Sequence, residues 1–390
     1  MGDSERDSLT VRTVGRIADL DAGQWDACAG DRNPFVSHAF LRALEDSGSA
    51  ARQTGWLPSH VAVEDATGRL VACAPAYVKS HSQGEYVFDY GWANAFERAG
   101  GRYYPKLLVA VPFSPVPGPR LLVGDGCGAP ELRRILGLAL AQIASQAELS
   151  SVHVNFAGED DWRLLGEIGY LQRTGVQFHW DNHGYGSFDD FLAQLSSRKR
   201  KAIRKERREV LESGIEFHVL RGDRILTAHW DAFFGFYMDT GDRKWGTPYL
   251  NRRFFDLLGD GLGDRVVLLL CRRQGRWIAG ALNLLGADTL YGRYWGCVED
   301  HRFLHFETCY YRAIDFAIEH GLQRVEAGAQ GEHKIQRGYL PVRTHSAHWI
   351  THAGLRDAVA RFLEEETRHV DWEVEAILRD YTPFRREDCG

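Results

Sequence analysis

Two stretches of the chain repeat one order of apolar strands and glycine turns. GRLVACAP begins at Gly68 and GRWIAGAL at Gly275, and each follows an apolar strand pattern. Glycine in the connecting turn therefore predicts a β-hairpin in both halves. An aromatic strand is predicted next in each half, YVFDYGWA from Tyr86 and LYGRYWGC from Leu290. Such self-similarity indicates two copies of one α/β unit.

A helix and one further strand complete each copy. The apolar spacing predicts helices from about Glu131 to Ala147 and from about Phe306 to His320, with Gly321 as the C′ residue of the second. Closing strands are expected in SVHVNFAG and QRVEAGAQ. We therefore predict an α/β fold with mixed sheets and two domains, residues 1–180 and 181–390.

The first half is longer than the second, and we assign the excess to an insertion at about residues 100–128. This stretch holds five of the twelve prolines, which exclude a continuous helix or a central strand. We predict a stiff extended loop. Tyr103, Tyr104, Lys106 and Phe113 are candidates for lining a pocket, and a purely structural cover over the first sheet is the alternative.

A strongly basic segment links the halves. FLAQLSSRKRKAIRKERREVLESG carries eight cations from Arg198 to Arg208, while its apolar residues fall within about 100° of helical arc. We predict one amphipathic helix over residues 188–213. Its cations would bind the phosphates of a donor or of RNA: Arg198, Lys199, Arg200, Lys201, Arg204 and Lys205. The alternative is a solvated helix paired with its own glutamates, of which only Glu206 lies within the run.

The bulk composition restricts the partners and the compartment. The net charge is −6, so no global basic field attracts nucleic acid or an anionic membrane. Seven cysteines occur without a CxxC pair, and no apolar run approaches 18 residues. The N-terminus lacks the apolar core of a signal peptide. We expect a reducing, cytoplasmic location without a transmembrane segment.

Several long motifs resemble one protein family. YYPKLLVAVPFSPVPGPRL, FHWDN, LHFETCYY and EAGAQGEHKIQRGYLPVRTHSAHW are similar to the bacterial FemAB-like subgroup of the GNAT superfamily of N-acyltransferases. The resemblance covers about residues 10–380. It implies two tandem GNAT-like domains joined by a basic helix. It also implies transfer of an amino acid from aminoacyl-tRNA to a peptidoglycan precursor.

One segment departs from the GNAT pattern. Acetyl-CoA-dependent members hold the pyrophosphate on a glycine-containing loop at a helix N-terminus. The corresponding VEDHRFLHFETC, residues 298–309, contains no glycine, so side chains would obstruct the close approach of the backbone to a pyrophosphate. This departure favours a donor other than acetyl-CoA or another mode of binding it.

The segment EAGAQGEHKIQRGYLP, residues 326–341, concentrates the chemistry that acyl transfer to an amine needs. By the resemblance, Glu326 lies where a GNAT-like sheet splays, and it is the candidate base. The other candidate catalytic residues are His333, Glu332 and Tyr311. Substrate binding is assigned to Gln330, Lys334, Arg337, Arg293, His305 and Glu307. The alternative is a surface loop with ordinary salt bridges, and Glu307 could simply cap a helix.

Other chemistries have less support. His345, His348 and His352 could suggest a metal, but THSAHWI alternates like a strand and separates the first two onto opposite faces. HExxH, P-loop and dinucleotide-binding motifs are absent from the sequence. We expect no metal site and no tightly bound cofactor, with the acyl donor acting as co-substrate.

The sequence thus predicts an N-acyltransferase that forms an amide on an amine acceptor, either a cell-wall precursor or a small metabolite. The donor would be an aminoacyl-tRNA or an acyl thioester such as acyl-CoA. The rival hypothesis is a non-catalytic protein that binds tRNA or a peptidoglycan precursor. A binder would need the cations of residues 326–341 but not Glu326 or Glu332. The oligomeric state is not predicted.

Overall fold

The chain forms two compact units, each a mixed α/β structure. A computed structural model describes residues 8–124, 128–244, 248–328 and 331–385. Unit 1 comprises Met1–Gly175 and Arg343–Asp371; unit 2 comprises Val176–Val342 and Trp372–Gly390. Strands β9 (Leu171–Asp181) and β15 (Leu340–Ile350) therefore each begin in one unit and end in the other. Among the described residues, no helix is both long enough and apolar enough to span a membrane.

Unit 1 begins with a strand and two helices and then builds its sheets. Besides its parts of β9 and β15, its elements are β1 (Thr10–Val14), α1 (Ala22–Ala29), α2 (His38–Asp46), β2 (Trp56–Pro58), β3 (His60–Glu64), β4 (Leu70–Ala74), β5 (Ala76–Lys79), α3 (Tyr90–Arg98), β6 (Lys106–Val109), β7 (Leu122–Val123), α4 (Ala129–Gln146), β8 (Ser151–Ala157), α5 (Glu159–Glu167) and most of α12 (Ala353–Ala376). One sheet has the order β1-β3-β4-β7, and the other contains β15-β8-β6-β5-β2.

The two faces of the second sheet differ in chemistry. Leu107, Val109, Val152 and Val154 point into an apolar core that α4 covers, and β6 and β8 run parallel there. Lys106, Ser151 and His153 alternate with them along the same strands and therefore point to the other face. One face is thus an ordinary core, while the other carries buried polar groups.

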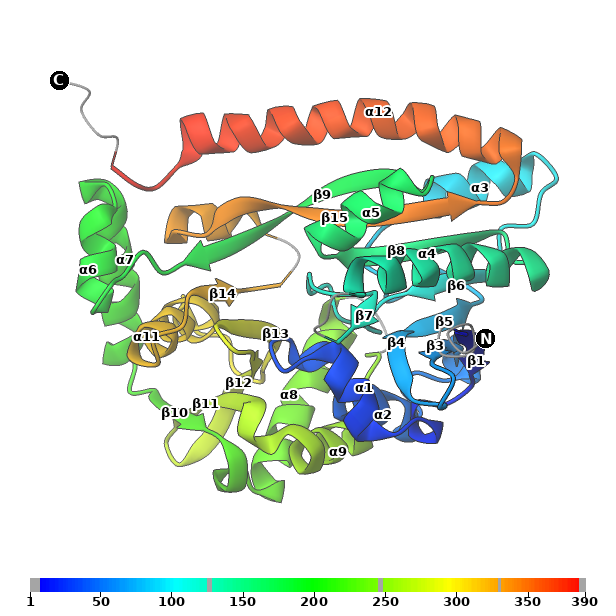
Figure 1. Cartoon of the computed structure of the whole chain (residues 1–390). Coiled ribbons are helices and arrows are strands. Elements are labelled where there is room, and N and C mark those ends of the chain that lie inside the picture. The colour runs from blue at the N-terminus through cyan, green and yellow to red at the C-terminus, as the bar shows by residue number, and fades with distance from the viewer. Residues whose placement is uncertain (1–7, 125–127, 245–247, 329–330, 386–390) are drawn as a thin grey trace. The chain divides into compact units, whose positions relative to one another are not determined.

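Unit 2 shares with unit 1 the order of a hairpin, a strand, a helix and a further strand. Besides its parts of β9, β15 and α12, it contains α6 (Phe188–Gln194), α7 (Ser197–Glu212), β10 (Glu216–Leu220), α8 (Thr227–Lys244), α9 (Arg252–Leu262), β11 (Val266–Arg273), β12 (Arg276–Leu285), β13 (Thr289–Cys297), α10 (Leu304–Phe306), a π-helical turn (Glu307–Tyr311), α11 (Arg312–Glu319), β14 (Arg324–Glu326) and two short segments, the 3-10 helix Glu332–Arg337 and the π-helical turn Ile377–Tyr381. Its strands lie in the order β10-β11-β12-β13-β14-β9. Helix α8 packs on β13 and α11 on β14 (Figure 1).

The predicted hairpins occupy the same place in both units. The β3–β4 and β11–β12 pairs are antiparallel, and Gly68 and Gly275 have φ of 78° and 77° in their turns. Each unit then has a parallel pair, β6 with β8 and β13 with β14. The predicted helices and closing strands are also present, as α4, the helical stretch from α10 to α11, β8 and β14.

Two predictions made from the sequence of unit 1 are wrong. The stretch from Tyr86 is not a strand: Tyr86 has φ of 60°, which breaks an extended run, and α3 begins at Tyr90. The predicted insertion at residues 100–128 contains Lys106–Val109, which is strand β6 between β5 and β8. The extra chain lies instead at residues 80–105, between β5 and β6, where unit 2 has only residues 286–288 between β12 and β13.

The basic helix predicted over residues 188–213 is two helices, α6 and α7. Leu195 is extended and forms a bridge with Phe384, and the Ser196 amide donates to the Pro383 carbonyl at 2.9 Å. These bonds to a distant segment satisfy backbone groups that a continuous helix would have used. Leu192, Leu195, Ile203 and Val210 are buried as predicted, whereas Ala202 is exposed.

Candidate active site

Glu326 lies where two parallel strands of unit 2 separate. Strand β14 pairs with β13 over three positions only, the last being Tyr291 with Glu326. Beyond this point β13 continues to Cys297 along β12. The neighbouring Gly292 permits the close approach, because a Cβ there would lie 3.3 Å from the Glu326 carbonyl oxygen. The last residue of β14 is thus a carboxylate at the mouth of a splayed sheet.

The surroundings of Glu326 favour its protonated form. The residue is only 7% exposed, and burial raises the pKa of its carboxyl to about 8, although Arg324 and Arg293 oppose this shift. His179 of β9 lies directly opposite, with Nδ1 3.9 Å from Oε1. Burial lowers the pKa of His179 to about 3, so this imidazole is neutral at pH 7. A carboxyl with a pKa near the working pH is suited to proton transfer.

Glycines shape the loop that follows Glu326. Gly328, Gly331 and Gly338 have φ of 78°, 124° and 90°, conformations that other residues rarely adopt. A Cβ at Gly331 would also lie 2.5 Å from the ring of His333. Of the predicted residues here, Gln330 and the side chain of Glu332 lie outside what the structure describes. The roles assigned to these two remain predictions.

Lys334 points inward from the loop. It is 2% exposed, and its ammonium donates a 2.7 Å hydrogen bond to the Gly328 carbonyl. Burial lowers the pKa of Lys334 to about 8, and Arg293 adds to this effect. The loop therefore carries a buried amine beside the segment that begins at Glu326.

His333 joins a row of aromatic rings. Its Nε2 lies 2.8 Å from the hydroxyl of Tyr310, and its ring centroid is 6.2 Å from that of His305. His305 in turn contacts Tyr310 and Trp295, at 5.3 and 5.4 Å between centroids. The row leads from the loop to a cavity of about 510 Å³ in the same unit. Trp295, Phe303, His305 and Phe306 supply its aromatic wall.

Arg337 and Tyr311 meet on a carboxylate of α7. The Arg337 guanidinium donates to both oxygens of Glu206, at 3.1 and 3.0 Å, and stacks 3.4 Å from the centre of the Phe306 ring. The Tyr311 hydroxyl also donates to Glu206, and Tyr311 is fully buried. Arg337 thus holds the loop, and Tyr311 the helical stretch, against α7. Tyr310, which is also buried, is the tyrosine whose hydroxyl contacts His333.

Glu307 belongs to a buried ion cluster. Arg207 donates to Glu307 at 3.1 Å and also binds Asp315, while Arg312 donates to Glu307 at 2.9 Å. Glu307 is fully buried, and burial raises the pKa of its carboxyl. Its Oε1 accepts from the two arginines, and its Oε2 has no hydrogen-bond partner among the described residues. The cluster holds α7 against the helical stretch that lines the cavity.

Helix α7 presents its remaining cations to solvent. Arg198, Lys201, Arg204 and Lys205 are exposed, and Arg200 is half-buried. Arg204 donates to Asp189 at 2.8 Å, and Lys199 donates to Gln336 at 2.9 Å. Because Glu206 binds Arg337 and Tyr311, it does not neutralise this face. The result is a positively charged helix surface, which we call the α7 cationic face.

The three histidines weighed as metal ligands do not converge. His345 packs on Trp162, His348 on His153, and His352 on Phe96. Within the described residues, no group of three histidine, cysteine or acidic side chains is arranged to hold a metal ion.

A family model decides the identity. The model of the FemAB-like proteins, described as peptidoglycan biosynthesis/recognition, matches residues 16–386. The chain belongs to the FemAB-like family. This family assignment confirms the predicted resemblance and extends over both units. No curated protein sequence matches this FemAB-like chain.

Solved structures share the fold at low sequence identity. A crystal structure of FemX has a TM-score of 0.54 and 13% identity, covering 87% of this chain and 98% of that one. The C-terminal domain of a putative lysylphosphatidylglycerol synthetase from Agrobacterium fabrum has a TM-score of 0.54 and 10% identity, covering 90% and 96%. L-PGS from Bacillus licheniformis has a TM-score of 0.51 and 11% identity, covering 86% and 98%. The predicted fold class, tandem GNAT-like units with mixed sheets, is confirmed.

The sequence missed three contributors to the site of this FemAB-like protein. His179 lies opposite Glu326, Tyr310 binds His333, and Arg207 holds Glu307. The alternation of Gln177, His179 and Asp181 along β9 was a usable signal, because polar residues at every second position share one face of a strand. Tyr310 and Arg207 gave no such signal, since one lay on an apolar helix face and the other within a run of cations.

Proposed function

We propose that this protein is an N-acyltransferase that forms an amide on an amine acceptor, with Glu326 as the general base. The observation that carries the proposal is the buried Glu326 carboxyl, whose pKa is about 8, at the splay of β13 and β14. A carboxylate with that pKa accepts a proton from an ammonium more effectively than an ordinary glutamate does. The splay gives the acceptor room to reach it.

The remaining groups fit the later steps of acyl transfer. The neutral amine attacks the acyl carbonyl, and its nitrogen then releases a proton to solvent. The bond from that carbon to the donor's oxygen or sulfur breaks, and the leaving group takes a proton. The hydroxyl of Tyr310, bound to His333, is placed to supply that proton. The Lys334 ammonium is a candidate donor to the developing oxyanion, because electrostatic stabilisation is strongest in a site that excludes water.

The donor is proposed to be an aminoacyl-tRNA. No glycine occurs in residues 298–309, and Phe303 occupies a left-handed conformation, with φ of 65°, just before α10. A bulky residue at this position obstructs the close backbone approach that a CoA pyrophosphate needs. The α7 cationic face offers phosphate contacts of the kind that a nucleic-acid backbone uses. The aromatic cavity is proposed to take the aminoacyl side chain.

The acceptor class follows from the family description, which names peptidoglycan biosynthesis and recognition. An amine on a peptidoglycan precursor is therefore the first acceptor to test. Recognition without catalysis is the rival function, since the same description includes it. The two functions differ in what they need from Glu326: transfer requires a base there, and binding does not.

The test is a transfer assay in which product mass is the readout. The protein is incubated with a pool of aminoacyl-tRNAs in one arm and with acyl-CoA thioesters in the other, each with peptidoglycan precursors and simple amines. We expect an amide product in the tRNA arm, absent with Glu326→Gln. A product only in the CoA arm would overturn the donor assignment. Binding of a precursor without product in either arm would favour the rival function.

Removing charge from the α7 cationic face should weaken donor binding. Replacing Arg198, Lys201 and Lys205 with Gln removes three exposed cations for which the described residues provide no ion pair. The slope of log Kd against log salt should change by about 2–3, because fewer counterions are released. The matched variant neutralises Arg52, Arg253 and Arg361, which lie outside α7, are also exposed and form no ion pair among the described residues. An unchanged slope in the α7 variant would assign this face to solvation.

A further inference from the structure

The strands of unit 1 place two lysines side by side in its interior. Lys79 ends β5, Lys106 begins β6, and the two are directly opposite in the antiparallel ladder. Both are fully buried. Like charges in directly opposite positions repel each other, and burying an ammonium is costly. When the two hairpins are aligned on Gly68 and Gly275, the equivalent positions of unit 2 hold Gly286 and Thr289, so the fold itself does not require the pair.

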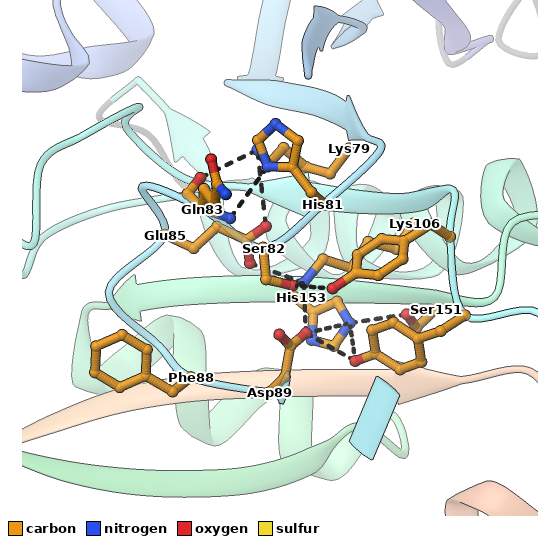
Figure 2. A network of polar contacts seen from close by, with 12 residues as sticks. Lys79, His81, Ser82, Gln83, Glu85, Phe88, Asp89, Lys106, Ser151 and His153 are labelled. Carbon is orange, nitrogen blue, oxygen red and sulfur yellow. Dashed lines mark hydrogen bonds and ion pairs between the residues drawn. The ribbon is translucent and has the colours of Figure 1, made fainter. Parts of the chain in front are cut away.

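The extra segment of residues 80–105 supplies the opposing charges. Lys106 Nζ donates to Glu85 Oε2 at 2.8 Å and also to Asp89, and Lys79 Nζ lies 3.9 Å from Glu85 Oε1 (Figure 2). Ser82 accepts from Lys106 at 2.8 Å. The segment thus neutralises a dicationic patch that the sheet creates.

The polar row continues across the same face of the sheet. His153 follows on β8, and its Nδ1 lies 2.7 Å from Nδ1 of His348 on β15. The Tyr103 hydroxyl donates to Asp89 at 2.7 Å and lies 3.4 Å from Nε2 of His153. Burial lowers the pKa of both imidazoles, to about 3 for His153, so neither adds charge. The positive charge of this pair of strands therefore rests on Lys106 and on Lys79, and burial lowers the pKa of Lys79 to about 7, so that an anion beside it would favour its charged form.

The closed arrangement leaves polar atoms unsatisfied. Among the described residues, Glu85 Oε1, Asp89 Oδ1, Trp56 Nε1 and Tyr77 Oη have no hydrogen-bond partner. Glu85 and Asp89 are 3% and 2% exposed, and Trp56 and Tyr77 are fully buried. Lys79 lies 3.7 Å over the Trp56 ring and makes one long hydrogen bond, 3.4 Å, to the Gln83 carbonyl. A polar core that served stability alone would satisfy these groups.

One side of the segment is anchored by apolar contacts. Trp92 and Ala93 of α3 pack with Tyr103 in a cluster that also holds Ile350, Leu355, Val359 and Leu363. Phe88 and Tyr90, on either side of Asp89, are 56% and 43% exposed and stack on each other. Figure 2 shows Phe88 directed away from the buried charges. The segment is therefore held by this apolar contact and by its two buried carboxylates together.

We propose that Lys79 and Lys106 form a binding site for a dianionic ligand, that residues 80–105 are its lid, and that Glu85 and Asp89 occupy the ligand's place when the lid is closed. The ligand carries two phosphates or two carboxylates. Directly opposite residues in a sheet have Cβ atoms about 4.5–5.5 Å apart, which suits a diphosphate or a compact dicarboxylate. The Trp56 ring, 3.7 Å from Lys79 Nζ, lies beside this site.

The test is chemical rescue of a lid variant. Glu85→Gln with Asp89→Asn removes both internal carboxylates, and we expect a lower Tm than in the wild type. Millimolar pyrophosphate or citrate should restore the Tm, whereas sodium chloride at equal ionic strength should not. Pyrophosphate and citrate distinguish a phosphate ligand from a carboxylate one. Adding Lys106→Met should abolish the rescue, and Glu97→Gln with Glu131→Gln, two exposed acids, should show neither effect.

Hydrogen exchange of the wild-type protein gives a second readout if the double variant does not fold. We expect the anion that binds to accelerate exchange in α3 by tenfold or more, with α4 unchanged, because it displaces the lid. Absence of rescue in a folded variant, or of any anion effect on α3 in the wild type, would overturn the proposal.

Discussion

Replacing Glu326 with Gln is expected to lower the turnover of amide formation by roughly 10²–10⁴-fold, because glutamine keeps the shape of the side chain but cannot accept a proton. The wild-type rate should rise with pH and level off above about 8, the pKa of the Glu326 carboxyl, since only the ionised form is a base. The variant should lose this rise. Steady-state kinetics across pH with product mass as the readout provide the measurement.

The same Glu326→Gln substitution that lowers turnover should leave the Tm unchanged or raise it. The folded-state pKa of Glu326 lies above that of an unfolded glutamate, so burial of the ionised carboxyl costs stability as the pH rises from about 4.5 to about 8. Glu326→Gln removes that cost, and its Tm at pH 8 should equal or exceed that of the wild type. The control is Glu319→Gln, an exposed glutamate at the end of α11. Full activity in a folded Glu326→Gln variant would exclude this residue as the base.

The second large effect concerns the buried ion cluster. Arg207→Met should lower the free energy of unfolding by about 3–5 kcal/mol, because it removes one of the two arginines that donate to the fully buried Glu307. Urea unfolding at neutral pH measures the change. The loss should shrink as the pH falls and Glu307 becomes protonated, since its folded-state pKa is already raised.

The neighbouring arginine provides a matched control. Arg208 is exposed, and its closest ion pair is with Glu212 at 3.9 Å. Arg208→Met should therefore change stability by less than about 1 kcal/mol. Equal effects of the two substitutions would show that the contacts of Arg207 with Glu307 and Asp315 contribute no more than those of a surface pair.

Local patterns determined what could be predicted of the fold. The hairpins were predictable because glycine with positive φ closes each turn, and the helices because their apolar residues recur at helical spacing. Strand β6 was missed because its four residues lie among prolines that forbid strands only a few positions later. The break at Leu195 was missed because its cause, Phe384, lies far away in the sequence.

The sequence predicted where the candidate site lies but not which residues contact it. Residues 326–341 were recognised from their glycines and mixed charges, and within that segment the structure buries Glu326 and Lys334 and joins His333 to Tyr310. The partners come from elsewhere: Glu206 of α7 binds Arg337, and His179 of β9 faces Glu326. Such pairings depend on tertiary packing between distant segments, which neither motif nor periodicity encodes.

The position of β15 late in the sequence also constrains how unit 1 folds during synthesis. Strand β8 pairs along one side with residues 345–350 of β15, which leave the ribosome almost 200 residues later. Until then β8 has an unpaired edge, and such edges promote association between chains. The first unit therefore cannot complete its sheet while the nascent chain is short. Truncation before β15 would expose that edge permanently.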